Sequence, residues 1–244
     1  MVLSIPYFFV ICMQFMGINE MKKLVIAPSI LAADFSDLKS AIDHCNNSDC
    51  TWLHLDIMDQ QFVPNLSFGP DVVKDIRKHS DLFFDVHLMV SNPFDMLDSF
   101  IDAGADGISF HIEATESRFT FPPKILINKI KRANLLCGIA IKPKTGFKII
   151  QKYMEFIDYV VVMSVEPGFA GQKFISESID KIKEIRSFID EKNLTDQVSI
   201  QCDGGIKLHN AKDVMNAGAN ILVAGSEVFQ SENPIETINK MNQL

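Results

Sequence analysis

The feature that most constrains the fold of this chain is a regular alternation of short apolar segments with segments of helical periodicity from residue 23 onward. The apolar segments predict strands at residues 24–31, 51–58, 82–89, 107–112, 136–141, 159–164, 197–203 and 220–224. The segments that follow them predict helices at 35–45, 70–79, 93–104, 122–134, 147–156, 176–192, 208–217 and 234–242. Strand–helix units that repeat about every 25 residues are typical of an α/β protein with a closed parallel (β/α)8 barrel, the TIM-barrel architecture.

An open doubly wound sheet is the alternative to a closed barrel. Such sheets commonly carry a G-x-G-x-x-G turn after a strand, and no predicted strand of this chain is followed by one. Eight units without a break also favour closure, so we expect the barrel.

Length and composition indicate one domain with an added N-terminal segment. The chain has 244 residues, of which 47% are hydrophobic, and a single barrel of this kind needs about 250. We expect the barrel to span residues 21–244. Residues 1–20 form a hydrophobic extension whose apolar run is too short for a membrane span, and which lacks the basic start and cleavage site of a secretory signal. It is either a targeting segment or a dispensable tail.

Charge and cysteine content argue against several classes of function. The net charge is -8, and no cluster of Lys or Arg is long enough to follow a phosphate backbone, so nucleic acid is not an expected partner. The five cysteines are scattered, odd in number and without a C-x-x-C pair, which favours free thiols in a reducing compartment. We therefore expect a cytoplasmic protein that does not enter a membrane, with the extension leaving targeting open.

Histidine and aspartate side chains share one face of two predicted strands. The alternation of a strand places His54 and Asp56 together, and likewise Asp85 and His87, while Asp203 ends a third strand. The carboxyl ends of barrel strands meet at the active-site face, so two imidazoles and two carboxylates are expected to converge there. This mixed nitrogen and oxygen set suits one divalent metal ion, with zinc as the first expectation and iron, manganese or cobalt as alternatives.

Other histidines are less informative. His111 and Glu113 end the fourth predicted strand, where they either support the site from behind or play a purely structural role. His44, His79 and His209 fall on predicted helices or at their ends and are expected at the surface.

The two aspartates suggest a reaction. A carboxylate that binds a metal through one oxygen keeps the other for proton transfer, and Asp56 and Asp203 come from strands that lie well apart in the sequence. They can act on opposite faces of one substrate carbon, after a metal has made the C–H bond beside a ketone acidic. Removal of the proton on one face and its return on the other inverts the carbon. This is an epimerase mechanism, and it needs no organic cofactor.

Glycine-bearing loops follow the last three predicted strands. They contain Gly168-Phe-Ala-Gly171, Gly204-Gly205 and Gly225-Ser226. Glycines leave backbone N–H groups uncovered, and a short helix that starts near Ser226 would direct its positive end at an anion. Barrels commonly bind phosphate after the seventh and eighth strands, so we expect a phosphorylated substrate.

Seven segments, in order and spacing, resemble motifs of the ribulose-phosphate 3-epimerase family, and Lys142-Pro143 and Val165-Glu166-Pro167 are similar to its eukaryotic version. The seven are Ala27-Pro-Ser-Ile-Leu31, Leu53-His-Leu-Asp-Ile-Met-Asp59, Phe62-Val-Pro-Asn65, Val86-His-Leu-Met-Val90, Val162-Met-Ser-Val-Glu-Pro-Gly-Phe-Ala-Gly-Gln172, Cys202-Asp-Gly-Gly-Ile206 and Ala219-Asn-Ile-Leu-Val-Ala-Gly-Ser226. The resemblance starts near Ile26 and excludes the extension. It implies a homo-oligomeric enzyme of the pentose phosphate pathway that interconverts D-ribulose 5-phosphate and D-xylulose 5-phosphate.

By position, the resemblance implies roles for individual residues. His54, Asp56, His87 and Asp203 would be the metal ligands, with Asp56 as proton acceptor and Asp203 as proton donor in one direction, through a metal-stabilised enediolate. The residues that would bind substrate are Ser29, Met58, His87, Met89, Met163, Gly168, Phe169, Ala170, Gly171, Asp203, Gly204, Gly205, Gly225 and Ser226. Ser29 and the methionines would contact the sugar, residues 168–171 would cover it, and the last four would hold the phosphate. For the methionines, ordinary packing in the barrel is an equal alternative.

Two residues depart from the family pattern. Gln60 stands where the family usually has glycine, and Ala170 replaces a glycine at a position where a β-carbon would hinder a left-handed backbone. Neither is a predicted ligand or proton-transfer group. We expect them to affect the shape and closure of loops rather than the type of reaction.

Three other functions are the alternatives to this one. A 3-epimerase for another phosphorylated ketose, such as allulose 6-phosphate, could use the same pair of acids. A phosphate-binding barrel decarboxylase would carry D-x-K-x-x-D, but Met58 and Gln61 stand at the lysine and second aspartate positions. A catalytically silent metal-binding barrel is disfavoured, because clusters of titratable groups usually mark function.

Overall fold

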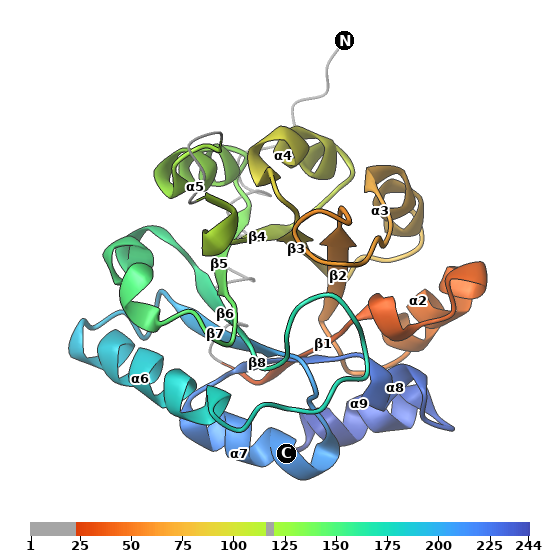
Figure 1. Cartoon of the computed structure of the whole chain (residues 1–244). Coiled ribbons are helices and arrows are strands. Elements are labelled where there is room, and N and C mark those ends of the chain that lie inside the picture. The colour runs from red at the N-terminus through yellow and green to blue at the C-terminus, as the bar shows by residue number, and fades with distance from the viewer. Residues whose placement is uncertain (1–22, 116–119) are drawn as a thin grey trace.

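The computed structural model describes residues 23–115 and 120–244, which form a barrel of eight parallel strands surrounded by helices (Figure 1). The strands are β1 (Val25–Pro28), β2 (Trp52–Met58), β3 (Phe83–Met89), β4 (Gly107–His111), β5 (Leu136–Ile141), β6 (Tyr159–Met163), β7 (Ser199–Asp203) and β8 (Ile221–Ala224). The α-helices are α2 (Leu38–Asn46), α3 (Pro70–Arg77), α4 (Pro93–Asp102), α5 (Pro123–Arg132), α6 (Ser178–Glu191), α7 (Leu208–Ala217), α8 (Ser226–Phe229) and α9 (Pro234–Asn242). The predicted TIM barrel is confirmed.

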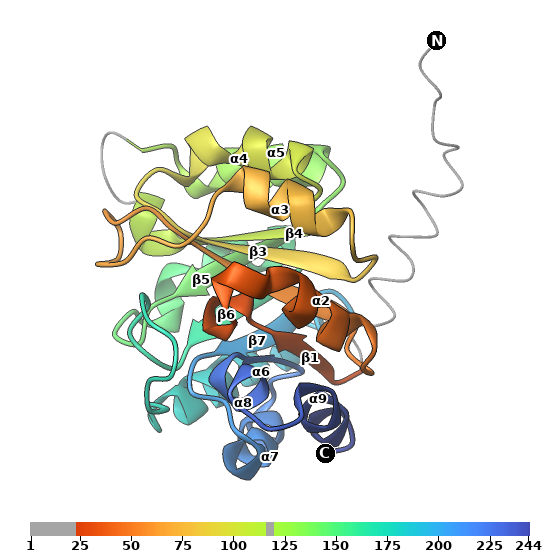
Figure 2. The ribbon, with the colours of Figure 1, turned by 90° about the vertical axis from the view of Figure 1, so that its right-hand side faces the viewer.

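The strands pair in the order β1-β8-β7-β6-β5-β4-β3-β2, and every pair is parallel. One isolated parallel bridge between Ser29 and His54 joins the end of β1 to β2 and completes the ring. Figure 2 shows α3, α4 and α5 lying along the outside of β3 and β4. The predicted extension at residues 1–20 and Cys12 lie outside the described residues, so the proposed domain boundary stays a prediction.

Two segments differ from the sequence-based expectation. The helix predicted at 147–156 is a pair of short 3-10 helices, η4 (Phe147–Ile149) and η5 (Gln151–Phe156). The buried side chains Phe147, Ile150 and Tyr153 recur every third residue, the period of a 3-10 helix. The predicted first helix begins with a 3-10 turn, η2 (Phe35–Asp37). Asp34 caps that turn, and Asp37 caps α2.

The remaining 3-10 helices are η1 (Ile30–Ala32) and η3 (Ile112–Thr115), which follow β1 and β4 directly. They shorten the predicted strands at 24–31 and 107–112 to β1 and β4. Both therefore lie at the carboxyl-terminal end of the barrel.

The barrel wall separates two apolar layers. Leu53, Leu55 and Ile57 of β2 belong to the large cluster that the strands and the outer helices form together. Trp52 of the same strand belongs to a second cluster with Tyr159 and residues of β1, β5 and β8. Since successive side chains of a strand point to opposite faces, the second cluster fills the interior of the barrel, and His54 and Asp56 share that interior face.

Two further features concern the length of the helices and the state of the cysteines. None of the helices in the described ranges is long and apolar enough to cross a bilayer. Cys45, Cys50, Cys137 and Cys202 are buried free thiols, as the scattered cysteines predict.

Candidate metal and substrate site

Four side chains converge at the mouth of the barrel. His54, Asp56, His87 and Asp203 each offer one ligand atom, and these atoms lie within 4.8 Å of one another. β2 carries the first two, β3 carries His87 in register with Asp56, and Asp203 is the last residue of β7. The structure brings together the four residues that the sequence analysis named, while their role as ligands stays a prediction.

The distances within the cluster pair nitrogen with oxygen. Asp56 Oδ1 lies 3.2 Å from both His54 Nε2 and His87 Nδ1. Asp203 Oδ2 lies 3.4 Å from His87 Nδ1 and 3.7 Å from His54 Nε2. Two imidazole nitrogens and two carboxylate oxygens that face a common point match the donor set of a divalent transition metal.

Asp56 divides its two oxygens between different partners. Oδ1 faces the two histidines, and Oδ2 accepts a hydrogen bond of 2.6 Å from Ser29 Oγ. Ser29 follows β1, so this contact spans the gap between the first and second strands of the barrel. One oxygen of Asp56 is thus available to a metal and the other to a substrate proton.

The charges of the cluster shift its pKa values. Burial alone would lower the pKa of His54, but the carboxylates of Asp56 and Asp85 outweigh burial and raise it well above its usual value. Burial would also lower the pKa of His87, but its contacts with Asp203 and Asp56 outweigh burial and raise it. For Asp56, burial would raise the pKa, yet the two imidazoles hold it below its usual range. Without a bound cation, the cluster therefore holds protons on imidazole rather than on Asp56.

The buried carboxylate of Asp85 contacts His54 on the side away from the cluster. Asp85 Oδ2 is 2.7 Å from His54 Nδ1 and accepts a hydrogen bond of 2.6 Å from Gln201 Nε2. Asp85 Oδ1 accepts one of 2.8 Å from Tyr159 Oη. Sequence reasoning placed Asp85 on the face of His87 but assigned it no role. The signal was its pairing position, because Asp85 lies opposite His54 in the β2–β3 register.

A second polar chain leads away from His87. His87 Nε2 lies 3.0 Å from His111 Nε2, and His111 Nδ1 lies 3.2 Å from Glu113 Oε2. Burial lowers the pKa of His111 to about 4, so its ring is neutral at pH 7. Burial would raise the pKa of Glu113, but hydrogen bonds from His111, Thr145 and the backbone of Lys142 outweigh it and lower the pKa to about 2.

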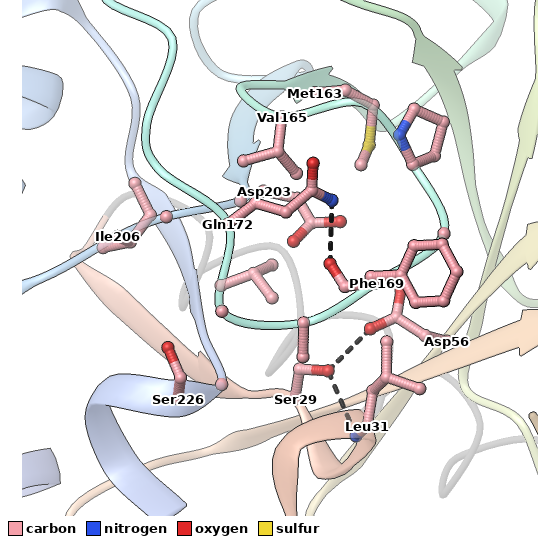
Figure 3. Close-up of a pocket in the computed structure, with 18 of the residues that line it drawn as sticks. Ser29, Leu31, Asp56, Met163, Val165, Phe169, Gln172, Asp203, Ile206 and Ser226 are labelled. Carbon is pink, nitrogen blue, oxygen red and sulfur yellow. Dashed lines mark hydrogen bonds between the residues drawn. The ribbon is translucent and has the colours of Figure 1, made fainter. Parts of the chain in front are cut away.

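An open cavity lies directly above the cluster (Figure 3). Its lining includes every predicted substrate-binding residue except His87, which is fully buried behind the carboxylates. Asp56 and Asp203 thus contact both the histidines and the cavity. The lining residues that sequence reasoning missed are Leu31, Val165, Pro167, Gln172, Ile206 and Val223. These residues belong to the motifs named above but were given no role, and they come from four segments: η1, the loops after β6 and β7, and β8.

The loop after β6 reaches over this cavity. Phe169 at its tip is 55% exposed and lines the same cavity as Asp56 (Figure 3). Gln172 Nε2 donates hydrogen bonds to the backbone oxygens of Glu166 and Phe169, and Asn65 Nδ2 donates one of 2.7 Å to Gly168 O. The loop is therefore braced both internally and against the loop after β2.

The two departures from the family pattern have different outcomes. Gln60 has a φ of 59°, so this position keeps the left-handed backbone that glycine favours. Ala170 is not among the non-glycine residues with positive φ, and Gly168 and Gly171 carry the left-handed conformations of its loop instead. The expectation that the β-carbon of Ala170 would hinder a left-handed backbone is therefore wrong.

Backbone groups and the side chain of Lys207 lie around the predicted phosphate position. Gly205 has a φ of 64°, and a β-carbon there would lie 2.6 Å from the backbone nitrogen of Phe174. Ser226 begins the short helix α8, as expected. Lys207 was not predicted: its Nζ donates a hydrogen bond of 3.0 Å to Ser226 Oγ and lies 3.2 Å from Glu227 Oε2. A basic residue two positions after the glycine pair was the available signal.

Solved structures with the same architecture have very different sequences. KGPDC from Streptococcus mutans superposes with a TM-score of 0.64 at 11% identity, covering 91% of this chain and 97% of that one. A 3-hexulose-6-phosphate synthase superposes with a TM-score of 0.59 at 14% identity, covering 91% and 98%. At this level of identity the likeness concerns the fold alone.

Relatives in sequence are much closer. The ribulose-phosphate 3-epimerase of Schizosaccharomyces pombe is 41% identical over 217 residues, which cover 88% of this chain and 90% of that protein. The chloroplastic ribulose-5-phosphate-3-epimerase of Arabidopsis thaliana is 39% identical over 215 residues, covering 88% and 75%. The family model described as "Ribulose-phosphate 3 epimerase family" matches residues 25–229. This chain belongs to the ribulose-phosphate 3-epimerase family.

Proposed function

We propose that this isomerase interconverts D-ribulose 5-phosphate and D-xylulose 5-phosphate with a divalent metal ion held by His54, Asp56, His87 and Asp203. The observation that carries the proposal is the double contact of the two aspartates. Asp56 and Asp203 face the two buried imidazoles on one side and line the substrate cavity on the other. Each can therefore hold a cation and exchange a proton with a bound sugar.

The residues present fit a metal ion. The imidazoles of His54 and His87 supply borderline-soft nitrogen ligands, and the carboxylates supply charge, so zinc remains the first expectation, with iron, manganese and cobalt as alternatives. When bound, the ion would polarise the ketone of the sugar and make the neighbouring C3 hydrogen acidic. No organic cofactor is needed for this chemistry.

The aspartates would carry the proton transfers. In one direction Asp56 removes the C3 proton, and Asp203 delivers a proton to the opposite face of the same carbon. The hydrogen bond from Ser29 Oγ holds the Asp56 carboxylate in one orientation. In the reverse direction the two aspartates exchange roles, so the same pair serves both substrates.

The rest of the cavity would position the phosphosugar. Backbone N–H groups of Gly204, Gly205 and Gly225, with the Ser226 hydroxyl, would bind the phosphate at the start of α8. Met58, Met89 and Met163 would contact the sugar. The loop at residues 168–171 would cover the bound substrate and exclude water, because it already reaches over the cavity.

Assembly and compartment are further expectations. We expect a homo-oligomer in the cytoplasm, with residues 1–20 leaving targeting open. Sedimentation of the purified protein measures the first, and microscopy of the full chain in its own cell measures the second. A monomer, or accumulation in an organelle, would contradict these expectations without affecting the proposed reaction.

NMR of D-ribulose 5-phosphate in D₂O with the purified enzyme tests the reaction. We expect deuterium at C3 and the appearance of D-xylulose 5-phosphate, both of which a chelator abolishes and added Zn²⁺ or Co²⁺ restores. Deuterium at C1 would indicate an aldose–ketose isomerase instead. Faster turnover of allulose 6-phosphate under the same conditions would show that a larger phosphoketose is the substrate.

Substitution of Asp203 tests its proposed part in the reaction. Asp203→Asn is expected to lower kcat for epimerisation by about 10²–10⁴-fold, the usual contribution of a general acid or base. Asp98→Asn, at an exposed position that pairs with Lys129, is the matched control and should keep full activity. Unchanged epimerisation by Asp203→Asn would show that the reaction uses another site.

A further inference from the structure

Each candidate ligand histidine has one ring nitrogen in the cluster and the other against a polar partner behind it. His54 presents Nε2 to the carboxylates and Nδ1 to Asp85, whereas His87 presents Nδ1 to the carboxylates and Nε2 to His111. The two rings thus use opposite nitrogens. A neutral imidazole can bind a metal only through the nitrogen that carries no hydrogen, so each ring requires a different tautomer.

We propose that two carboxylates set these tautomers, the buried Asp85 directly on His54 and the half-buried Glu113 through His111 on His87. The proposal rests on the metal site proposed above and extends it to residues that do not contact the ion. Asp85, Glu113 and His111 are positioning residues in this account, because they act only through the ligands.

In the first branch, His54 Nδ1 lies 2.7 Å from Asp85 Oδ2 and 3.2 Å from Gln201 Nε2, whose shorter hydrogen bond, of 2.6 Å, goes to Asp85 Oδ2. Asp85 accepts hydrogen bonds from Gln201 Nε2 and Tyr159 Oη, both of which are donors in this arrangement. Because both oxygens of Asp85 serve as acceptors, the contact of 2.7 Å places the hydrogen on His54 Nδ1. The lone pair of His54 is then on Nε2, which faces Asp56 and Asp203.

The second branch has an additional imidazole. Glu113 Oε1 accepts hydrogen bonds from the Lys142 backbone N–H, at 2.8 Å, and from Thr145 Oγ1, and Oε2 faces His111 Nδ1 at 3.2 Å. Glu113 therefore requires the hydrogen of His111 on Nδ1. The lone pair of His111 Nε2 then accepts across the 3.0 Å contact, so His87 must carry its hydrogen on Nε2 and keep Nδ1 free for a metal.

Packing keeps this chain in place. The rings of His87 and His111 stack with centroids 5.0 Å apart, and Phe62 covers His111 at 4.8 Å. His54, Asp85, His87 and His111 are all fully buried, so water does not compete for their hydrogen bonds. Reversing the tautomer of His111 alone would place two N–H groups against each other at 3.0 Å, and reversing that of His87 alone would oppose two lone pairs. Either change leaves a buried polar group without a partner.

A purely structural role for Glu113 is the competing explanation. Its bonds to Lys142 and Thr145 connect the end of β4 to the loop after β5, and that connection does not involve His111. The two explanations differ in one respect. A structural role acts on metal affinity independently of His111, whereas tautomer control acts only through it.

Calorimetric titration of the metal-free, full-length protein with Zn²⁺ tests both branches. Asp85→Asn and Glu113→Gln should each weaken Zn²⁺ binding by about 10–100-fold, the usual effect of removing a partner behind a metal ligand. In Glu113→Gln, the side-chain amide can take two orientations. If its nitrogen faces His111, it donates to Nδ1 and reverses the tautomer of His111. If its oxygen faces His111, its N–H groups face the backbone N–H of Lys142 instead. Asp98→Asn and Glu236→Gln, at exposed ion pairs, are matched controls that should bind as the parent does.

A double-mutant comparison separates tautomer control from structure. His111→Leu should weaken Zn²⁺ binding, and adding Glu113→Gln to it should have no further effect, because the connection to His87 is already lost. If instead the two losses multiply, Glu113 acts independently of His111 and the proposal for the second branch is wrong. Thermal unfolding of each variant identifies any that fail to fold.

The unsubstituted protein gives a second readout that needs no variant. Long-range ¹H–¹⁵N NMR of the zinc-loaded enzyme should show hydrogens on His54 Nδ1, His87 Nε2 and His111 Nδ1. The opposite assignment for either ligand ring would overturn its branch. Failure of the parent to bind Zn²⁺ would refute the proposed metal site, whereas tight binding by the parent and by all variants would refute only the present inference.

Discussion

Gln60 shows at the scale of one residue how hydrogen bonds can stabilise a turn in which a residue other than glycine has a left-handed backbone. Its φ of 59° is one of three positive values among the non-glycine residues in the described ranges. The neighbouring Asp59 accepts hydrogen bonds from the backbone N–H groups of Gln61, Phe62 and Ser91. Gln60 itself donates from its backbone to Asn65 O at 2.9 Å. These bonds stabilise a turn that a side chain at position 60 makes less favourable.

A substitution at position 60 tests this balance. Gln60→Val should lower the free energy of unfolding by about 1–2 kcal/mol, because a β-branched side chain is poorly tolerated in the left-handed region. Gln60→Gly should stay within about 1 kcal/mol of the parent, since relief of strain offsets the greater freedom of the unfolded chain. Urea denaturation measures both, and equal stability of the two variants would contradict the left-handed assignment.

Lys207 is a residue-scale feature of the predicted phosphate position. Its ammonium group donates to the hydroxyl of Ser226 and pairs with Glu227, so it lies next to the start of α8. Lys207→Met should raise KM for D-ribulose 5-phosphate by about tenfold, the worth of one hydrogen bond to a charged group, with kcat nearly unchanged. Lys212→Met, exposed on α7, is the control and should leave KM as it is. A lower kcat at unchanged KM would place Lys207 elsewhere in the reaction.

How far the sequence predicted the site depends on the residue. Strand alternation was enough to place His54 with Asp56, because the face of a strand follows from its period of two. It could not assign a partner to Asp85, since Tyr159 and Gln201 reach it from β6 and β7 across the barrel interior. Contacts across a barrel depend on the strand order and tilt, which no short stretch of sequence specifies.

At the scale of elements, β4 and β5 make room for large side chains of other strands. A β-carbon on Gly138 of β5 would lie 2.5 Å from Tyr159 Cε2, and one on Gly107 of β4 would lie 2.9 Å from Phe83 Cε1. Phe83 also stacks on Trp52, with ring centroids 4.0 Å apart. Two glycines on adjacent strands therefore let three aromatic rings fill the interior beneath the polar cluster.

Gly138→Ala tests this packing. The added methyl group must displace the ring of Tyr159, and overpacking of this kind typically costs about 1–3 kcal/mol of stability. Because Tyr159 also donates to Asp85, a displaced ring should weaken Zn²⁺ binding as well. Thermal unfolding and metal titration measure the two effects. Gly146→Ala, where an added β-carbon meets nothing within 4 Å, is the matched control.

The segment at 147–156 shows why element type was harder to predict than element position. Its apolar residues fit a helix, and the structure has helical turns there, but of the 3-10 kind. Over so short a segment, apolar residues spaced by three, as in a 3-10 helix, cannot be told from the spacing of three or four that an α-helix shows. Element positions were predicted within a few residues elsewhere because eight repeats of one unit constrain one another.

At the scale of the whole molecule, metal binding should be linked to pH. Because the pKa values of His54 and His87 are raised, the metal-free protein holds more protons on these rings than free imidazoles would at the same pH. A ligating imidazole must be neutral, so metal uptake releases protons, and affinity rises as pH rises. Calorimetric titration at pH 7 in two buffers with different ionisation enthalpies should give different apparent enthalpies. Identical enthalpies would show that no protons leave.

The bridge between Ser29 and His54 joins the two ends of the strand order, and the Ser29 hydroxyl also holds Asp56. Separation of β1 from β2 would therefore deprive the Asp56 carboxylate of its partner at the same moment. An ion bound by His54 and Asp56, as proposed, would fix one side of this junction. Local opening of the barrel between β1 and β2 and loss of catalytic activity are then the same event. A bound cation should slow amide hydrogen exchange along β1 more than in strands far from this junction.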